Sequence, residues 1–202
     1  MEYSYILENS DRILRPVRVD DAEFIVKLRN QPHVIGRVND SLADVEKQRE
    51  WIREYLKREN EYYWIMETLD HRPFGTTSLY HYCAEKRQME TGRWVKMADA
   101  PQDVNQFACR IQKNDFAFDV LGLKRLVFDV VSTNKSVLKY HQLCGAIETG
   151  VAKDFFVIQG RPVDMVWFEE TPESWKAVRS KLCRWAGIDP TAPCGKITKV
   201  ML

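Results

Sequence analysis

The sequence lacks long apolar runs and any clear excess of charge of one sign. No apolar stretch approaches the roughly 18 to 20 residues that a helix needs to cross a bilayer. Lysine plus arginine (30) nearly cancels aspartate plus glutamate (29), so no long-range field draws nucleic acid or an anionic membrane to the protein. The first residues also lack the basic and apolar regions of a secretory signal. We therefore expect a cytoplasmic protein without nucleic-acid or membrane partners.

Cysteines are few and scattered along the chain. An odd number of widely spaced cysteines, mostly among apolar neighbours, is typical of reduced thiols rather than of a disulfide framework. No pair has the spacing of zinc ligands, and His81 with Cys83 supplies only two groups, too few for a closed metal site. We therefore expect no metal. The cysteines are Cys83, Cys109, Cys144, Cys183 and Cys194.

The composition is that of a folded globular protein. Hydrophobic residues make up 45% and charged residues 29% of the 202 positions, which suits one core of ordinary size. We expect a single domain over residues 1–186. From Gly187 onward two prolines and two glycines interrupt regular structure, so residues 187–202 are expected to form a C-terminal tail or an arm that reaches a neighbouring subunit of a homodimer.

The first part of the chain predicts one strand and two helices. Arg12 to Val19 alternates apolar and polar residues like a half-buried strand. Asp20 followed by Glu23 resembles a capping box, and the helix that it begins ends by Pro32. A second helix is expected to begin at Ser41, with Asp44 three residues on. Three strands joined by short turns follow: Tyr62 to Thr68, Phe74 to Tyr80, and Gln88 to Lys96.

The second part predicts a mixed α/β order. A helical pattern runs from Asp103 to Leu121, and a compact β-branched strand follows at Leu126 to Val131. Strand, helix and strand in succession predict a parallel pair, here the fourth and fifth strands. The remaining predicted elements are a short helix at Asn134 to Leu143, strands at Ala146 to Val157 and Val163 to Glu169, and a last helix at Pro172 to Ala186.

This order, and above all the run from Phe116 to Gly150, resembles the GNAT superfamily and specifically its RimJ/RimL-like branch. In the family an AFxxLGL-like phrase leads to the fifth strand, then to an asparagine, a short helix, and a glycine eleven residues after that asparagine. Asn134 and Gly145 keep this spacing. The stretches Leu14 to Pro32 and Met89 to Trp94 look like the family's opening strand and helix and its fourth strand.

The resemblance implies a GNAT fold, in which a mostly antiparallel sheet contains one parallel pair and is flanked by helices. It also implies an acetyl-CoA-dependent N-acetyltransferase, with acetyl-CoA as co-substrate and a primary amine as acceptor. No nucleophile motif points to a covalent intermediate, so we expect direct attack in a ternary complex. A rival interpretation is a GNAT-fold binding module without activity, and another is an enzyme that uses a different acyl donor.

The family's pyrophosphate loop, Q/R-x-x-G-x-G/A, falls near Pro101 to Gln106, where both of its glycines are missing. A helix N-terminus can still hold a pyrophosphate through its unpaired N–H groups. Side-chain-bearing Val104 and Gln106 must then fit a normal helical start, and Asp103 adds a negative charge. An ordinary capped helix is the alternative. The expected phosphate-facing backbone comprises Val104, Asn105, Gln106, Phe107 and Ala108.

Further cofactor contacts follow from the resemblance. Asn134 is expected to contact the pantetheine arm, to cap the next helix, or to do both, and Lys139 on that helix is assigned to the cofactor as well. A backbone N–H of the fourth strand is the natural donor to the thioester oxygen, which places Trp94, Val95 or Lys96 near it. Trp94 either lines the acceptor groove or is plain core.

Acid and base candidates come from the same segments. The family commonly has a tyrosine acid seven residues after the asparagine, where this chain has His141, with Tyr140 as the reserve acid. A histidine of pKa near 6.5 donates a proton close to neutral pH, although a helix-surface histidine without a catalytic role fits equally. For the base we favour Glu90 over Asp129. The alternative for either carboxylate is a plain ion pair with Arg93 or Lys124.

The identity of the acceptor substrate is the property that the sequence determines least. It is expected to be set by the first two helices and by the hairpin around Phe155 to Val163. Amino-sugar nucleotides, protein N-termini, polyamines and aminoglycosides all stay open. The RNQP phrase, Arg29 to Pro32, is similar to amino-sugar acetyltransferases and favours the first of these classes.

Overall fold

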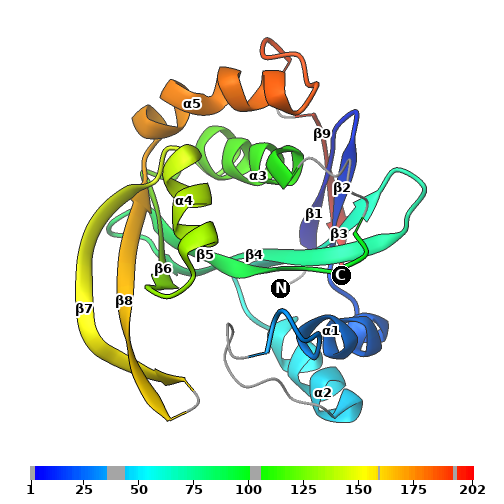
Figure 1. Ribbon diagram of the computed structural model, residues 1–202. Helices are drawn as coiled ribbons and strands as arrows, with labels where there is room; N and C mark the ends of the chain where they lie inside the picture. The colour runs from blue at the N-terminus through cyan, green and yellow to red at the C-terminus, as the bar shows by residue number, and fades with distance from the viewer. Residues whose placement is uncertain (1–2, 36–43, 101–105, 159, 193–194) are drawn as a thin grey trace.

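A mixed sheet forms the middle of the molecule, and helices cover both of its faces (Figure 1). The computed structural model describes residues 3–35, 44–100, 106–158, 160–192 and 195–202. Over these residues the sheet has nine strands in the order β7-β8-β6-β5-β4-β3-β2-β1-β9. The strands are β1 (Tyr3–Glu8), β2 (Arg12–Pro16), β3 (Tyr62–Thr68), β4 (Pro73–Cys83), β5 (Gln88–Lys96), β6 (Arg125–Val131), β7 (Ile147–Ile158), β8 (Arg161–Glu170) and β9 (Lys196–Met201).

Helices α3, α4 and α5 lie on one face of the sheet, and α1 and α2 lie on the other (Figure 1). Within the described ranges, no helix is both long enough and apolar enough to cross a membrane. The helices are α1 (Ala22–Arg29), α2 (Val45–Tyr55), α3 (Gln106–Asp115), α4 (Lys135–Leu143) and α5 (Pro172–Trp185), with a 3-10 turn, η1 (Val19–Asp21), and a π-helical turn, η2 (Phe116–Val120).

The central strand β3 shows why both faces are covered. All seven of its residues, YYWIMET, are buried. Because side chains alternate along a strand, Trp64 and Met66 join the core under α3, whereas Tyr63 and Ile65 join the core under α1 and α2. A strand covered on both sides is apolar along nearly its whole length, as this one is.

The predicted parallel pair is present. Strands β5 and β6 run parallel, with Gln88 opposite Arg125 and Glu90 opposite Val127. The other strand pairings of the described residues are antiparallel. The two strands are the fifth and sixth rather than the fourth and fifth, because β1, which the sequence did not predict, precedes them.

The helix expected from Asp103 to Leu121 is divided into two parts. Residues 101–105 lie outside the described part of the chain, and α3 gives way to the π-turn η2 at Phe116. Three successive residues of η2, Phe116 to Phe118, are buried. Ala108–Asp115 of α3 are buried as well, so burial on all sides continues from the α-helix into the wider π-turn. The element ends, as predicted, at Gly122, whose φ is +63°.

The C-terminal residues are not a free tail. Strand β9 pairs with β1 along its length, from Glu8 opposite Lys196 to Tyr3 opposite Met201. Gly195, at φ +93°, leads into it, and a Cβ at that position would lie 2.2 Å from the carbonyl oxygen of Glu8. The prolines and glycines therefore interrupt regular structure only up to Gly195. For Lys196–Met201 the expectation of a tail is wrong.

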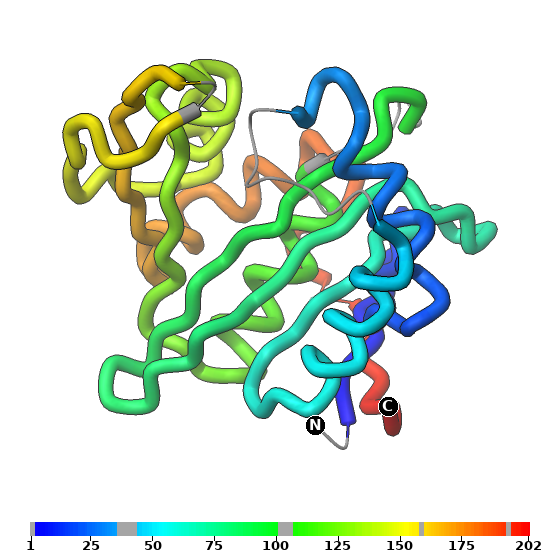
Figure 2. The backbone as a smooth tube through the Cα atoms, turned by 90° about the horizontal axis from the view of Figure 1, so that it is seen from below, coloured from blue at the N-terminus to red at the C-terminus, as the bar shows by residue number. Residues whose placement is uncertain are grey.

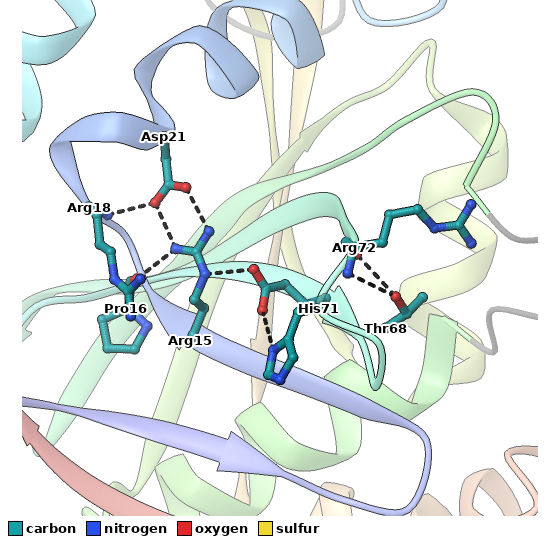
Figure 3. A network of polar contacts seen from close by, with 8 residues as sticks. Arg15, Pro16, Arg18, Asp21, Thr68, His71 and Arg72 are labelled. Carbon is teal, nitrogen blue, oxygen red and sulfur yellow. Dashed lines mark hydrogen bonds and ion pairs between the residues drawn. The ribbon is translucent and has the colours of Figure 1, made fainter.

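The helix starts differ from the predicted ones. The capping carboxylate belongs to the 3-10 turn η1 that leads into α1, and it is Asp21, not Glu23: it accepts from the backbone N–H of Arg18 at 2.7 Å. Asp21 is also the N-cap residue of α1, but its side chain makes no capping hydrogen bond to that helix. Figure 3 shows the Arg15 side chain beside this carboxylate, and the N···O distance between them is 2.7 Å. Nε of Arg15 also lies 2.6 Å from Oε1 of Glu67. Arg15 thus fixes the start of α1 to strands β2 and β3.

At α2 the N-cap is Asp44, whose carboxylate accepts from Glu46 and Lys47 N–H, and Ser41 lies outside the described residues. The cysteines that the structure describes are free thiols: Cys83 is half-buried, and Cys109, Cys144 and Cys183 are buried.

Candidate functional site

The two parallel strands separate after three rungs. Their ladder ends at Glu90 and Val127, but β5 continues to Lys96 and β6 to Val131. Over the described residues, the β6-side edge of β5 beyond Glu90 therefore faces no strand. Figure 2 shows the tubes of β5 and β6 diverging. An unpaired strand edge is a row of backbone donors and acceptors that an extended amide-containing ligand can use.

A β-bulge lies in this free part of β5. Gly92 pairs with Ser78 and Val95 pairs with Thr76, so Arg93 and Trp94 together stand opposite Thr77. Arg93 has a φ of +52°, which is uncommon for a residue with a side chain. Bulges re-aim backbone groups next to active sites.

Hydroxyl groups of β4 hold the bulge in place. Thr76 donates to the carbonyl of Arg93 at 2.7 Å, and Ser78 donates to the carbonyl of Gly92 at 3.1 Å. A Cβ on Gly92 would lie 2.6 Å from the Tyr80 hydroxyl, so the glycine lets that ring cover the strand.

The three residues expected at the thioester lie on different sides of this strand end. The ring of Trp94 lies 6.4 Å from that of Tyr140 and packs against the main core. Val95 is buried under α1. The side chain of Lys96 is exposed, and its carbonyl accepts from Gln31 at 3.4 Å.

The two predicted carboxylates come together at the end of the parallel ladder. Glu90 is the last paired residue of β5, and Asp129 lies two residues beyond its partner Val127 on β6. Partial desolvation and the negative charge of Glu90 raise the pKa of Asp129 above its ordinary value. Among the described residues, neither carboxylate forms an ion pair with Arg93 or Lys124, so the plain ion pairs that we considered are absent from this part of the chain.

His81 is a neighbour of Glu90 that the sequence did not assign. Its Nδ1 lies 3.1 Å from Oε1 of Glu90. Both side chains can reach solvent, with 59% and 40% exposed. The register of the β4–β5 hairpin brings the two residues together, because it sets Tyr80 opposite Glu90. The pairing is irregular just after Tyr80. His81 has a φ of +53° at that irregularity.

His141 does not have the protonation state expected of it. Its ring packs on Phe128 at a centroid distance of 4.3 Å, and its Nδ1 lies 3.1 Å from the Arg110 guanidinium. Burial and the charges of Arg110 and Lys113 lower the pKa of His141 to about 2. Because a guanidinium only donates, Nδ1 accepts and the proton is on Nε2. The argument that His141 donates near neutral pH is therefore wrong.

Tyr140 faces the free edge of β5 instead. Its ring stacks on Phe107 at 5.8 Å and approaches Trp94, so α4, α3 and β5 meet at this ring. The guanidinium of Arg110 lies 5.3 Å from its centroid. Burial raises the pKa of Tyr140, and the charge of Arg110 opposes that rise.

A layer of buried charged and polar groups supports this side of the site. Arg110 of α3 forms an ion pair with Glu170 of β8, to which Asn114 also donates at 2.9 Å. Lys113 donates to the hydroxyl of Thr91 on β5. Burial, with the charge of Arg110 second, holds the pKa of Lys113 well below its usual range. The sequence analysis did not identify these groups, because nothing in one chain marks a charged helix face as buried.

The expected phosphate loop is described only in part. Val104 and Asn105 lie outside the described residues, and α3 begins at Gln106. Phe107 is half-buried and Ala108 is buried. The part of this first turn that the structure describes lies next to Tyr140, through the ring of Phe107, and its phosphate-binding role stays a prediction.

Asn134 does not cap α4 with its side chain, contrary to one of its two expected roles. Its Oδ1 accepts from the Ser136 hydroxyl at 3.2 Å. With Thr133, Lys135 and Ser136 it lines a surface cavity of about 280 Å³. Lys139 is exposed on the same helix. Over the described residues, no group of three or more side chains is arranged to hold a metal ion.

The chain matches the family model for the acetyltransferase (GNAT) domain over residues 11–147. A solved structure described as apo FdhC, a nucleotide-linked sugar GNAT, is 26% identical, with a TM-score of 0.74 over 90% of this chain and 98% of that one. The spermidine N-acetyltransferase of Vibrio cholerae, solved with CoA and spermine, is 20% identical, with a TM-score of 0.73 over 83% of this chain and 99% of that one. A search of curated proteins found no match.

Proposed function

The chain belongs to the GNAT acetyltransferase family, and from that premise we propose that it acetylates the primary amine of an amino-sugar nucleotide or a similar small molecule. It is an acetyl-CoA-dependent N-acetyltransferase, and acetyl-CoA is its co-substrate. Protein N-termini are the acceptor class that we place second. Membership of the RimJ/RimL-like branch stays a prediction from Phe116 to Gly150.

One observation carries the proposed mechanism: Glu90 lies where β5 loses its partner β6, beside the backbone that the acetyl donor needs. A substrate ammonium has to lose a proton before it can attack a thioester. We propose that Glu90 accepts this proton, directly or through water. We propose that His81 positions the Glu90 carboxylate through their 3.1 Å contact. Asp129 is the neighbouring carboxylate whose charge competes with that of Glu90.

The free edge of β5 fits the amide groups of the CoA arm, because both are extended rows of N–H and C=O groups. Backbone N–H groups at the Arg93–Trp94 bulge support the proposal of an oxyanion donor next to Glu90. Tyr140 replaces His141 as the proposed proton donor to the departing thiolate, since it faces Trp94 and Phe107. We assign the phosphate contacts to the start of α3 and keep Asn134 and Lys139 as proposed cofactor contacts.

The preference for a sugar nucleotide has two supports. The relative at 26% identity is described as a nucleotide-linked sugar GNAT, and the RNQP phrase points the same way. The spermidine enzymes lie below 25% identity and support the fold alone. An amine panel incubated with acetyl-CoA and followed by mass shift tests the proposal. We expect acetylation of nucleotide-linked amino sugars, and acetylation of peptide N-termini alone would contradict it.

A second candidate, a CoA-binding module without activity, is favoured by the missing glycines near Pro101 to Gln106. Calorimetry with acetyl-CoA, followed by a thiol-release assay over the same panel, separates the two. Binding without release from any amine favours the module.

A further inference from the structure

Arg93 lies in a cage of four aromatic rings. Its guanidinium carbon is 4.3 Å from the centroid of Tyr80, 5.3 Å from Tyr63, 5.4 Å from Trp51 and 5.9 Å from Tyr55. The rings come from α2, β3 and β4. Three separate elements thus converge on one cation at the bulge of β5.

The charge of Arg93 has no acidic partner among the described residues. No carboxylate of this part of the chain forms an ion pair with it, and its Nη1 is buried without a hydrogen-bond partner. Aromatic faces attract a guanidinium, but they do not accept its N–H groups as an oxygen does. A buried donor without a hydrogen-bond partner costs stability, and because Nη1 has no exposed surface, a ligand oxygen reaches it only if a ring of the cage moves aside.

The backbone of Arg93 is also held in an unfavourable conformation. A φ of +52° is unfavourable for a residue with a Cβ, and glycine is the usual residue in such a position. The Thr76 hydroxyl fixes this conformation through the Arg93 carbonyl. Strain that is kept by specific contacts is typical of functional positions.

The cage is next to the carboxylate assigned to deprotonate the amine. Tyr80 pairs directly with Glu90, and its ring is the one nearest to Arg93. Three residues along a strand span on the order of 10 Å, which is the size of a small acceptor. An acceptor that meets both residues carries an amine at one end and an anion at the other.

Resting on the proposed function, we propose that Arg93 is the anion site for the acceptor, holding a phosphate or diphosphate group through two parallel N–H donors. A planar guanidinium matches phosphate oxygens in this bidentate way. The same charge disfavours polyamines, which carry only cations. The alternative is that Arg93 only fixes α2 to the sheet through the four rings.

Calorimetry with inorganic pyrophosphate in the presence of saturating CoA tests the site, since CoA blocks the cofactor's own phosphate groove. We expect binding by the wild type and at least tenfold weaker binding by Arg93→Met. The matched control is Arg58→Met: Arg58 lies 5.7 Å from the same Trp51 but is exposed and lies 3.5 Å from Glu61. We expect this control to bind as the wild type does.

Two results would overturn the proposal: a folded Arg93→Met that binds pyrophosphate like the wild type, or loss of wild-type binding once CoA is saturating. If Arg93→Met does not fold, Arg93→Lys decides, because lysine keeps the charge and loses the planar pair of donors. Weaker binding by Arg93→Lys at an unchanged melting temperature supports the site, and unchanged affinity overturns it. No turnover is involved, so a failure to acetylate any amine would count against the proposed function alone.

Discussion

Nδ1 of His141 accepts a hydrogen bond from Arg110, and burial, together with the charges of Arg110 and Lys113, lowers the pKa of the histidine and keeps it neutral. The His141 ring packs on Phe128 of β6, whereas the neighbouring Tyr140 ring lies near Trp94 of β5. Two adjacent residues of α4 therefore have different surroundings, and we propose different roles for them.

The first prediction separates these two residues. Tyr140→Phe should lower kcat about tenfold. This loss is smaller than the roughly 10²- to 10⁴-fold rate contribution that is typical of general acid–base catalysis, because a thiolate is a good leaving group even without a proton donor. His141→Gln should leave kcat unchanged, since glutamine can also accept from Arg110. A thiol-release assay at saturating acetyl-CoA measures both. The reverse order of effects would return the acid role to His141.

The second prediction concerns stability against pH. The folded pKa of His141, about 2, lies below its unfolded value of 6.5. The unfolded chain therefore binds more protons between these values, so the contribution of neutral His141 is full above pH 6.5 and is lost as pH falls toward 2. The melting temperature should drop between pH 7.5 and 5.5, and His141→Gln should reduce that drop.

The control for this pH effect is His33→Gln, since His33 is exposed and contacts only the edge of the site through the Lys96 carbonyl. An equal pH dependence in the wild type and in His141→Gln would contradict the assignment.

The third prediction concerns the attachment of α5. Arg179 donates to both carboxylate oxygens of Asp115, at 2.8 to 3.0 Å, and to the carbonyls of Pro190 and Ala192. The Asp115 side chain is fully buried. Arg179→Met should lower the free energy of unfolding by about 3 to 5 kcal/mol, because it leaves a buried carboxylate without its cation.

Urea unfolding measures this loss, and Arg184→Met is the matched control, an exposed arginine on the same helix. A loss no larger than that of the control would show that Trp175, which also donates to Asp115, satisfies the carboxylate alone.

The sequence predicted the interior of the fold better than its edges. The apolar run Tyr62–Thr68 and the β-branched run at Arg125–Val131 mark buried strands, and both are present. Strands β1 and β9 were missed: β1 lies between β2 and β9, and β9 is a short strand that pairs with β1 from the other end of the chain. Such a pairing between the two ends of a chain has no local signal.

The candidate site was predictable to a similar degree. The neighbouring positions of Glu90 and Asp129 follow from the family pattern, which places their strands together, and their roles stay predictions. The contacts that change the properties of a residue were not predictable: His81 reaches Glu90 through hairpin register, and the cation that lowers the pKa of His141 comes from another helix. The aromatic cage of Arg93 joins residues 51 to 93, which only the tertiary fold assembles.

The most direct test of the proposed acetyl transfer is the pH–rate profile of Glu90→Gln, measured with an acceptor found in the amine panel. The control is Glu169→Gln, because the Glu169 carboxylate pairs with Arg125 of β6 instead. We predict that kcat/KM falls at least roughly 100-fold at pH 7. Part of the activity should return as pH rises toward the pKa of the amine, because free amine then needs no base. Wild-type rates and an unchanged profile in Glu90→Gln would show that Glu90 does not take the proton.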